Sequence, residues 1–158
     1  MNKKISKNIF IIFILLLSSC SYEPIFSNKD YGFSLNEIKF VGDKEVNRNI
    51  KNRLSFIKKK MNQTDESFDL SIETVKEKKI ISKDSRGDPL KFELIILTDL
   101  EVFDNNKLIL NREIEKSYIY NNVSDKFKLE EDEKIISENL SEKTSETIIS
   151  LILNLNDN

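Results

Sequence analysis

The residue types that could support catalysis or metal binding in this chain are few. The 158-residue sequence contains one cysteine and no histidine or tryptophan. A histidine general base, a cysteine–histidine pair and a His/Cys zinc site are therefore excluded by composition. Carboxylate or serine–lysine chemistry is compatible with the composition, but no spacing singles out such a set. The sequence accordingly predicts no catalytic residue, no metal site and no cofactor.

The single cysteine, Cys20, follows a segment with the pattern of an export signal. Three lysines lie within the first seven residues, nine apolar residues occupy positions 9–17, and two serines precede the cysteine. The apolar run is too short to span a bilayer as a permanent helix. We therefore predict that residues 1–19 form a cleaved signal peptide.

The four residues Leu17-Ser18-Ser19-Cys20 resemble the lipobox of bacterial lipoproteins, in which the cysteine is acylated and becomes the first residue of the mature protein. No second cysteine is present, so Cys20 has no disulfide partner. Each buried methylene of an acyl chain contributes about 0.8 kcal/mol, and several chains on one cysteine anchor a protein stably. Cys20 is thus the predicted lipidation site. The alternative is an ordinary export signal that ends near a free cysteine.

The mature chain is acidic. Residues 1–19 carry three lysines and no acidic residue, so their removal leaves 139 residues with 22 basic and 27 acidic side chains, a net charge of −5. This charge argues against nucleic acid as a partner, although local basic patches remain possible. A chain of this length can bury one core, and the sequence shows no internal repeat and no second domain.

The elements that must position any site begin after a tether predicted at residues 20–34, where Pro24 and Gly32 interrupt regular structure. Residues 35–41 alternate as expected for a first strand. Asp43 can cap the helix that follows, whose apolar residues recur every three or four positions. These apolar residues are Val46, Ile50, Leu54, Ile57 and Met61.

Three further strands are expected after this helix. Alternating apolar residues predict a second strand over residues 68–81 and a third over residues 90–102, separated by a polar loop at residues 82–89. Asp104-Asn105-Asn106 then forms a tight turn, because asparagine and aspartate tolerate positive φ. Residues 108–120 are predicted to return as the fourth strand.

A second amphipathic helix is predicted over residues 129–155. The order strand, helix, three strands, helix favours an α+β two-layer sandwich, with two helices packed on one face of a four-stranded mixed sheet. The last three strands should form an antiparallel meander. The first strand should lie parallel to a neighbour, because a helix connects it to the next strand. The predicted domain covers residues 35–158.

Almost all of the mature chain resembles the lipopolysaccharide-assembly lipoprotein family LptE, in its short alphaproteobacterial form. Cys20-Ser21-Tyr22-Glu23-Pro24-Ile25-Phe26 is similar to the family's opening, although many members have glycine where this chain has serine. Arg48-Asn49-Ile50-Lys51-Asn52-Arg53-Leu54 is similar to its first helix. Arg86 and residues 90–102 are similar to its loop and long strand, and Ser117-Tyr118-Ile119-Tyr120 to the end of its last strand.

The resemblance implies a non-enzymatic component of lipopolysaccharide export. Members of this family sit as a plug inside the outer-membrane β-barrel LptD, assist its assembly, and contact lipopolysaccharide on its way to the outer leaflet. The implied partners are LptD, lipopolysaccharide and the membrane that holds the lipid anchor. The implied location is the periplasmic side of the outer membrane. Large barrels do enclose lumens that need filling.

Three basic residues around the second hairpin loop, Lys83, Arg86 and Lys91, are candidate ligands for the phosphates of lipid A. Arginine and lysine are the natural phosphate ligands among side chains. The alternative is an ordinary solvated loop, in which these charges alternate with Asp84 and Asp88.

Two other features have competing interpretations. Tyr118 and Tyr120 lie two residues apart on one predicted strand face. They are either interface aromatics against a barrel wall or residues packed in the core or at the sheet edge. The run Lys58-Lys59-Lys60 could face anionic lipid. It also suits a solvated helix end, where cations meet the negative end of the helix dipole, and we prefer this second interpretation.

Two rival functions stay open at the level of the sequence. The first is an unrelated periplasm-facing lipoprotein that serves as a scaffold in another envelope assembly or secretion complex. The second is an anchored hydrolase that uses carboxylates alone, which no acidic pair in a recognisable motif supports.

Overall fold

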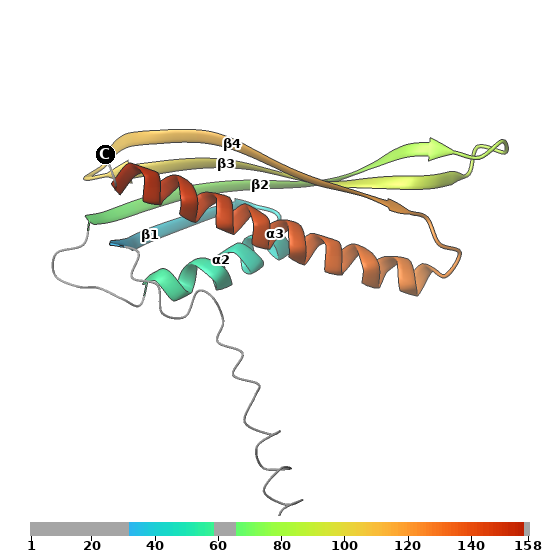
Figure 1. Cartoon of the computed structure of the whole chain (residues 1–158), viewed down its shortest axis with the longest axis horizontal. Helices are drawn as coiled ribbons and strands as arrows, with labels where there is room; N and C mark the ends of the chain where they lie inside the picture. Colours follow the sequence, from blue (N-terminus) through green and yellow to red (C-terminus); the bar gives the residue numbers. More distant parts are fainter. Residues whose placement is uncertain (1–31, 59–65, 157–158) are drawn as a thin grey trace, which may run out of the picture.

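The computed structural model describes residues 32–58 and 66–156, shown in Figure 1. The predicted signal peptide, Cys20, Lys59 and Lys60 lie outside the described residues. The first strand begins two residues earlier than predicted. Phe33 and Ser34 were predicted to belong to the tether, but they are buried residues of this strand. The elements are β1 (Phe33–Gly42), α2 (Lys44–Lys58), β2 (Glu66–Lys83), β3 (Pro89–Asp104), β4 (Lys107–Asn121) and α3 (Lys126–Asn156).

The four strands form one sheet in the order β1-β2-β3-β4. β1 lies parallel to β2, whereas β2, β3 and β4 form an antiparallel meander. Helix α2 makes the crossover between the two parallel strands, and both helices lie on the same face of the sheet (Figure 1). α2 contacts β1, α3 contacts β3 and β4, and the two helices contact each other. The predicted α+β two-layer architecture is confirmed.

The junction between β1 and α2 is held tightly against β2. Gly42 has a φ of +97°, and a Cβ at this position would lie 1.9 Å from the carbonyl oxygen of Thr74. The Asp43 N–H donates to that same oxygen at 3.0 Å. The Asp43 carboxylate accepts the N–H groups of Glu45 and Val46 at 3.0 and 2.9 Å, which confirms the predicted N-cap. α2 therefore starts at a fixed point on the sheet.

The core is one apolar layer between the sheet and the helices. Val46, Ile50 and Leu54 are fully buried, as the predicted helical stripe requires. The side chains of Ile57 and Met61, the other two predicted members, lie outside the described part of the chain. The strands contribute alternate residues that face the helices, among them Leu70, Ile72, Leu94, Ile96, Leu100 and Val102.

The buried side of α3 is rich in small hydroxyl side chains. Ser137, Ser141, Thr144 and Ser145 are each at most 1% exposed. The hydroxyls of the last three donate to the carbonyl four residues earlier, at 2.7, 3.0 and 2.8 Å. These bonds satisfy the hydroxyl protons within the helix itself. The small side chains therefore let α3 pack closely with these three donors paired, whereas the Ser137 hydroxyl has no hydrogen-bond partner in the described ranges.

No described helix covers the opposite face of the sheet (Figure 1). At its centre three carboxylates lie side by side on neighbouring strands, since Glu73 is opposite Asp99 and Asp99 is opposite Glu113. Glu115 lies on the same face as Glu113, two residues further along β4. This face therefore has an acidic centre.

The β2–β3 hairpin extends beyond the rest of the domain. β1 pairs with β2 only as far as Gly42, which lies opposite Thr74, so residues 75–83 of β2 pair with β3 alone. Figure 1 shows the end of this hairpin reaching past the start of α3. The three basic residues chosen from the sequence as phosphate ligands belong to this projecting end.

Candidate functional site

The turn at the end of the β2–β3 hairpin is organised by Asp84. Its Oδ1 accepts the N–H groups of Arg86 and Asp88, both at 2.9 Å. The Gly87 N–H donates to the Asp84 carbonyl at 3.1 Å, and Gly87 has a φ of +91°, which favours glycine. The hydrogen bond from the Asp88 N–H contributes most to lowering the pKa of the Asp84 carboxyl. Asp84 therefore acts as an ionised acceptor that closes the turn.

Arg86, the first candidate phosphate ligand, is paired within this turn. Its Nε and one terminal nitrogen each lie 3.4 Å from Asp84 Oδ2, and the terminal nitrogen lies 3.7 Å from a carboxylate oxygen of Asp88. The side chain is 80% exposed, so water also competes for its donors. Two adjacent carboxylates offset the charge of Arg86, which favours its interpretation as part of a solvated turn.

Lys83 and Lys91 are the two candidates that the structure leaves available. Lys83 is the last residue of β2, and Lys91 lies on β3 opposite Ser82, so the hairpin brings the two lysines to one end of the molecule. Both are exposed, and neither has an ion-pair partner within 4.0 Å among the described residues. Together they place two uncompensated positive charges beside the turn.

Two other lysines of the hairpin serve the structure. Lys76 Nζ lies 2.6 Å from the carboxylate of Glu45 on α2. Lys78 pairs with Glu133 on α3, and its Nζ also lies 4.1 Å from the centre of the Phe92 ring. These pairs join β2 to both helices, and the sequence analysis did not identify them. Residues 31 and 55 positions apart give no local spacing signal for such pairs.

Tyr120 and Tyr118 point to the helix side of β4 but have different environments. Tyr120 is 9% exposed, packs against Phe92 with ring centres 5.7 Å apart, and donates its hydroxyl to Glu133 at 2.8 Å. Burial, together with the neighbouring Glu133 carboxylate, raises the pKa of Tyr120 above its usual value. Tyr118 is 54% exposed. The core interpretation therefore holds for Tyr120, and Tyr118 is a surface aromatic.

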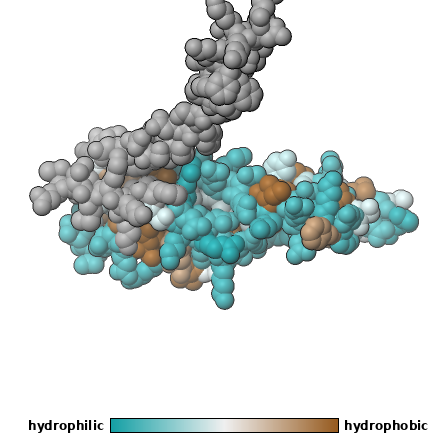
Figure 2. Space-filling view, turned by 90° about the horizontal axis from the view of Figure 1, so that it is seen from below, coloured by the Kyte–Doolittle hydropathy of each residue, from teal (hydrophilic) through white to brown (hydrophobic). Residues whose placement is uncertain are grey.

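A groove of about 740 Å³ lies between the end of β4 and α3, and the sequence analysis did not predict it. Tyr118 and Ile135 form exposed apolar parts of its lining. The helix side of the domain is otherwise mostly hydrophilic, with separate apolar patches (Figure 2). The sequence signals that could have indicated this groove are the uncharged strand end Ser117–Asn121 and the apolar pair Ile135-Ile136.

The described ranges contain neither a metal-binding cluster nor a membrane-spanning helix. No group of three or more Cys, Asp or Glu side chains there is arranged to hold a metal ion. Among the described helices, none is both long and apolar enough to cross a membrane. The predicted lipidation site, Cys20, lies outside these ranges.

Comparison with known proteins identifies similar folds. No protein-family model matches this sequence, and no curated protein does. Among solved structures, the rare lipoprotein B from Shewanella oneidensis is similar with a TM-score of 0.54 and 19% identity, over 76% of this chain and 98% of that chain. The uncharacterized lipoprotein B from Nitrosomonas europaea is similar with a TM-score of 0.61 and 15% identity, over 82% of this chain and 90% of that chain.

A minor lipoprotein from Acinetobacter baumannii is also similar, with a TM-score of 0.51 and 10% identity, over 75% of this chain and 93% of that chain. At these identities the likeness establishes the fold alone. This chain therefore has the fold of these bacterial lipoproteins over most of its own length and nearly all of theirs.

Proposed function

We propose that this protein is an outer-membrane lipoprotein of the LptE kind, which plugs the LptD β-barrel, assists its assembly and takes part in lipopolysaccharide transport to the outer leaflet. The observation that carries the proposal is the fold shared with bacterial lipoproteins over nearly their whole length. The lipobox cysteine at position 20 is consistent with it. The proposed activity is binding and positioning, without a catalytic step.

The two ends of the domain suit an anchored plug. Phe33 at the start of β1 lies beside Glu66 at the start of β2, so the chain leaves toward Cys20 from this end of the sheet. β2 has 18 residues, and a rise of about 3.3 Å per residue places its far end roughly 60 Å away. The point where the chain enters the domain and the lysine-bearing hairpin end therefore lie at opposite ends of the sheet.

Lys83 and Lys91 are the proposed contacts for the phosphates of lipid A. A lysine ammonium is a compact charge with three donors, which can bind a phosphate oxygen without the fixed geometry that arginine requires. Arg86 is expected to contribute less, because Asp84 and Asp88 already bind its guanidinium. The hairpin end is therefore still the proposed ligand site, with Lys83 and Lys91 as its main contacts.

A charge-reversal experiment tests the ligand part of the proposal. The double variant Lys83→Glu/Lys91→Glu should bind purified lipopolysaccharide more weakly than the unmodified protein at low salt. High salt should reduce the difference. Its melting temperature should change little, since isolated surface charges contribute about 0–1 kcal/mol. The matched control is Lys39→Glu/Lys107→Glu, which makes the same change in net charge at two exposed lysines elsewhere.

Two results would count against this ligand site. An equal loss of binding in both double variants would mean that only overall charge matters. If Lys83→Glu/Lys91→Glu bound lipopolysaccharide normally at low salt, the hairpin end would be an ordinary solvated loop and not a ligand site.

Recovery of partners tests the other part of the proposal. A tagged copy extracted from outer membranes with mild detergent should co-purify with a large β-barrel protein. A Cys20→Ala variant should fail to incorporate labelled palmitate and should leave the outer-membrane fraction. Recovery with a different envelope complex and no large barrel would support the scaffold alternative instead.

A further inference from the structure

We propose that the end of β4 and the groove beside α3 bind an extended, cationic segment of a partner protein, which adds to the sheet as a fifth strand. The segment would form backbone hydrogen bonds with β4 residues 117–121 and place alternate side chains in the groove. The inference goes beyond the proposed function, and it does not require the partner to be a barrel.

The first support is the backbone edge of β4. β4 is the last strand in the sheet order, so no strand of the described chain pairs with its outer side. Natural sheets protect such edges with charged side chains. Residues 112–116 of β4 have this protection, whereas residues 108–111 and 117–121 carry no charge, and of these two segments only 117–121 borders the groove. The charged residues of the strand are Lys107, Arg112, Glu113, Glu115 and Lys116.

The second support is that the groove lies beside this unprotected part of the edge. Tyr118 and Tyr120 belong to both features, and Ile135 lies on the opposite wall of the groove. Successive side chains of an added strand would alternate between the two faces of the sheet, so every second one would enter the groove. There they would cover Tyr118 and Ile135, which are 54% and 50% exposed.

The third support is the charge of the groove. Of the four charged residues that line it, three are carboxylates, Asp132, Glu142 and Glu146, and only Lys143 is basic. Glu142 is already paired with Arg53 on α2 at 3.1 Å. Asp132 and Glu146 have no ion-pair partner within 4.0 Å in the described ranges. A segment that carries lysine or arginine would therefore be favoured over an acidic one.

The opposite face of β4 favours the same partner charge and argues against the chain's own tether. Glu113 and Glu115 lie on that face just before the paired residues 117–121, so a strand that extended past Ser117 would meet carboxylates there as well as in the groove. The tether residues 21–31 have a net charge of −1. They enter the domain at β1, which is the other edge of the sheet. The groove therefore fits a segment from another molecule better than it fits the tether.

A peptide probe tests the inference on the full lipid-anchored protein, with its sequence unchanged, in detergent micelles. The probe is a ten-residue peptide that alternates lysine and valine, and the comparison peptide alternates glutamate and valine. The lysine peptide should bind about ten-fold more tightly or better. On binding it should slow amide hydrogen exchange at residues 117–121 of β4, which a purely electrostatic association would not do.

N-methylation of the probe tests the backbone pairing. In a strand, alternate N–H groups point to the same edge, so methylation of every valine blocks one edge and methylation of every lysine blocks the other. One of these two peptides should lose binding and the other should keep it. Equal binding of both methylated peptides would overturn strand addition. Equal binding of the lysine and glutamate peptides would overturn the charge argument.

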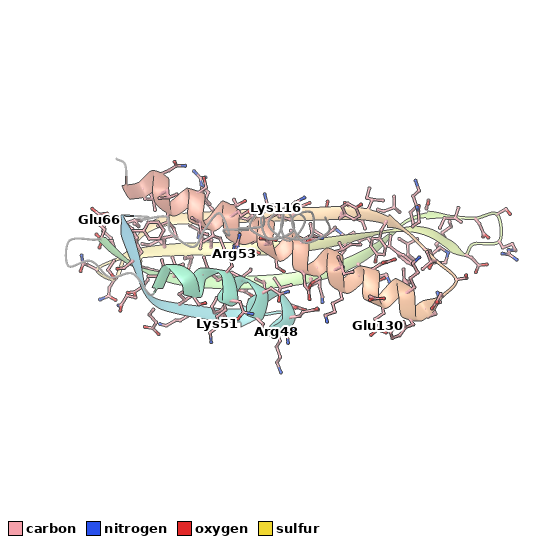
Figure 3. All side chains as sticks on the ribbon, turned by 60° about the horizontal axis from the view of Figure 1, so that its bottom comes forward. Arg48, Lys51, Arg53, Glu66, Lys116 and Glu130 are labelled. Atoms are coloured by element: carbon pink, nitrogen blue, oxygen red, sulfur yellow. The ribbon has the colours of Figure 1, made fainter. Side chains whose placement is uncertain are left out.

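Two double variants of α3 locate the site. Asp132→Lys/Glu146→Lys changes the groove, and Glu130→Lys/Glu138→Lys makes the same charge change at exposed positions outside its lining. Glu130 lies near the start of α3, well away from Arg53 (Figure 3). The groove variant should bind the lysine peptide about ten-fold more weakly than the unmodified protein does, and the control variant less than about two-fold more weakly. If both double variants lost the same amount of affinity for the lysine peptide, the peptide would not bind in the groove. The peptide comparisons stand without either variant if one fails to fold.

Other occupants of the groove would give distinct results in the absence of peptide. Slow exchange at residues 117–121 that is lost on dilution would assign the edge to a second copy of this chain. Slow exchange that is lost when residues 22–26 are replaced by glycine and serine would assign it to the tether. Slow exchange that appears only in phospholipid nanodiscs would assign the groove to an acyl chain. Each of these results would overturn the proposal.

Discussion

The contact between Tyr120 and Glu133 joins the last strand to the last helix, and Tyr120→Phe removes only its hydroxyl. That hydroxyl donates to the Glu133 carboxylate at 2.8 Å. The ring, which is 9% exposed and packs against Phe92, would stay in place. Glu133 would keep its ion pair with Lys78. The substitution therefore isolates one hydrogen bond.

The expected loss at neutral pH follows from the type of bond. A hydrogen bond to a charged group contributes about 1.5–3 kcal/mol, and partial solvent access to Glu133 should reduce this to about 1–2 kcal/mol. The Glu133 side chain is 24% exposed, which is the reason for the reduction. The free energy of unfolding at pH 7 should therefore fall by that amount in Tyr120→Phe.

At alkaline pH, the free energies of unfolding of the unmodified protein and of Tyr120→Phe should differ less than at pH 7. Burial and the Glu133 carboxylate raise the pKa of Tyr120 in the folded state, whereas an unfolded tyrosine ionises near pH 10. Above pH 10 the unfolded chain loses a proton that the folded chain keeps. Stability then decreases by up to about 1.4 kcal/mol per pH unit. Phenylalanine has no ionisable proton, so Tyr120→Phe does not lose stability in this way. By pH 11 the difference in free energy of unfolding between the two proteins should therefore be smaller by about 1 kcal/mol.

Urea unfolding at pH 7 and pH 11 measures both effects, because ionisation of the lysines is common to the two proteins. Tyr118→Phe is the matched control, since its ring is half exposed, and it should change stability little at either pH. A Tyr120→Phe difference that stays constant from pH 7 to pH 11 would refute the coupling to Glu133. So would an absorbance titration in which Tyr120 ionises near pH 10.

Five further substitutions, at four positions, test the fold. Leu54→Ala and Leu94→Ala, at positions 0% and 4% exposed, should each lower the free energy of unfolding by about 2–5 kcal/mol in urea titrations. Losses of a few tenths in both would contradict the two-layer core. Ser141→Leu should overfill a fully buried site and lose about 1–3 kcal/mol, whereas Ser141→Ala should be tolerated, and equal effects would mean that space is not limiting. Gly42→Ala should lower the melting temperature, because its Cβ would overlap the Thr74 carbonyl, and an unchanged melting curve would show that this junction can move.

The architecture was predictable because the signals for it are local. The Asp43 cap and the apolar repeat of α2 lie within one short segment, and strand alternation placed the three later strands correctly. The Asp104–Asn106 turn was also predictable, since Asn105 and Asn106 both have positive φ. The buried serines of α3 were not identified as core residues. A hydroxyl that bonds to its own helix looks, in sequence, like any polar surface residue.

The candidate sites were only partly predictable. The sequence correctly placed Lys83, Arg86 and Lys91 at one hairpin, but the pairing of Arg86 with Asp84 and Asp88 depends on the geometry of the turn. The groove between β4 and α3 brings together residues 118–123 and 132–146, whose contact across the sheet edge has no periodic signature. The different environments of Tyr118 and Tyr120 depend on where α3 crosses the strand.

Photocrosslinking in intact cells tests most directly the proposal that the domain sits inside a barrel. A crosslinking amino acid would be placed at Ile119, on the open face of the sheet, and separately at Lys51, on the exposed side of α2. If the domain is a plug, both positions should crosslink to the same large outer-membrane β-barrel, because a lumen wall surrounds the domain. Crosslinks to a barrel from one face only, or from neither, would contradict the account.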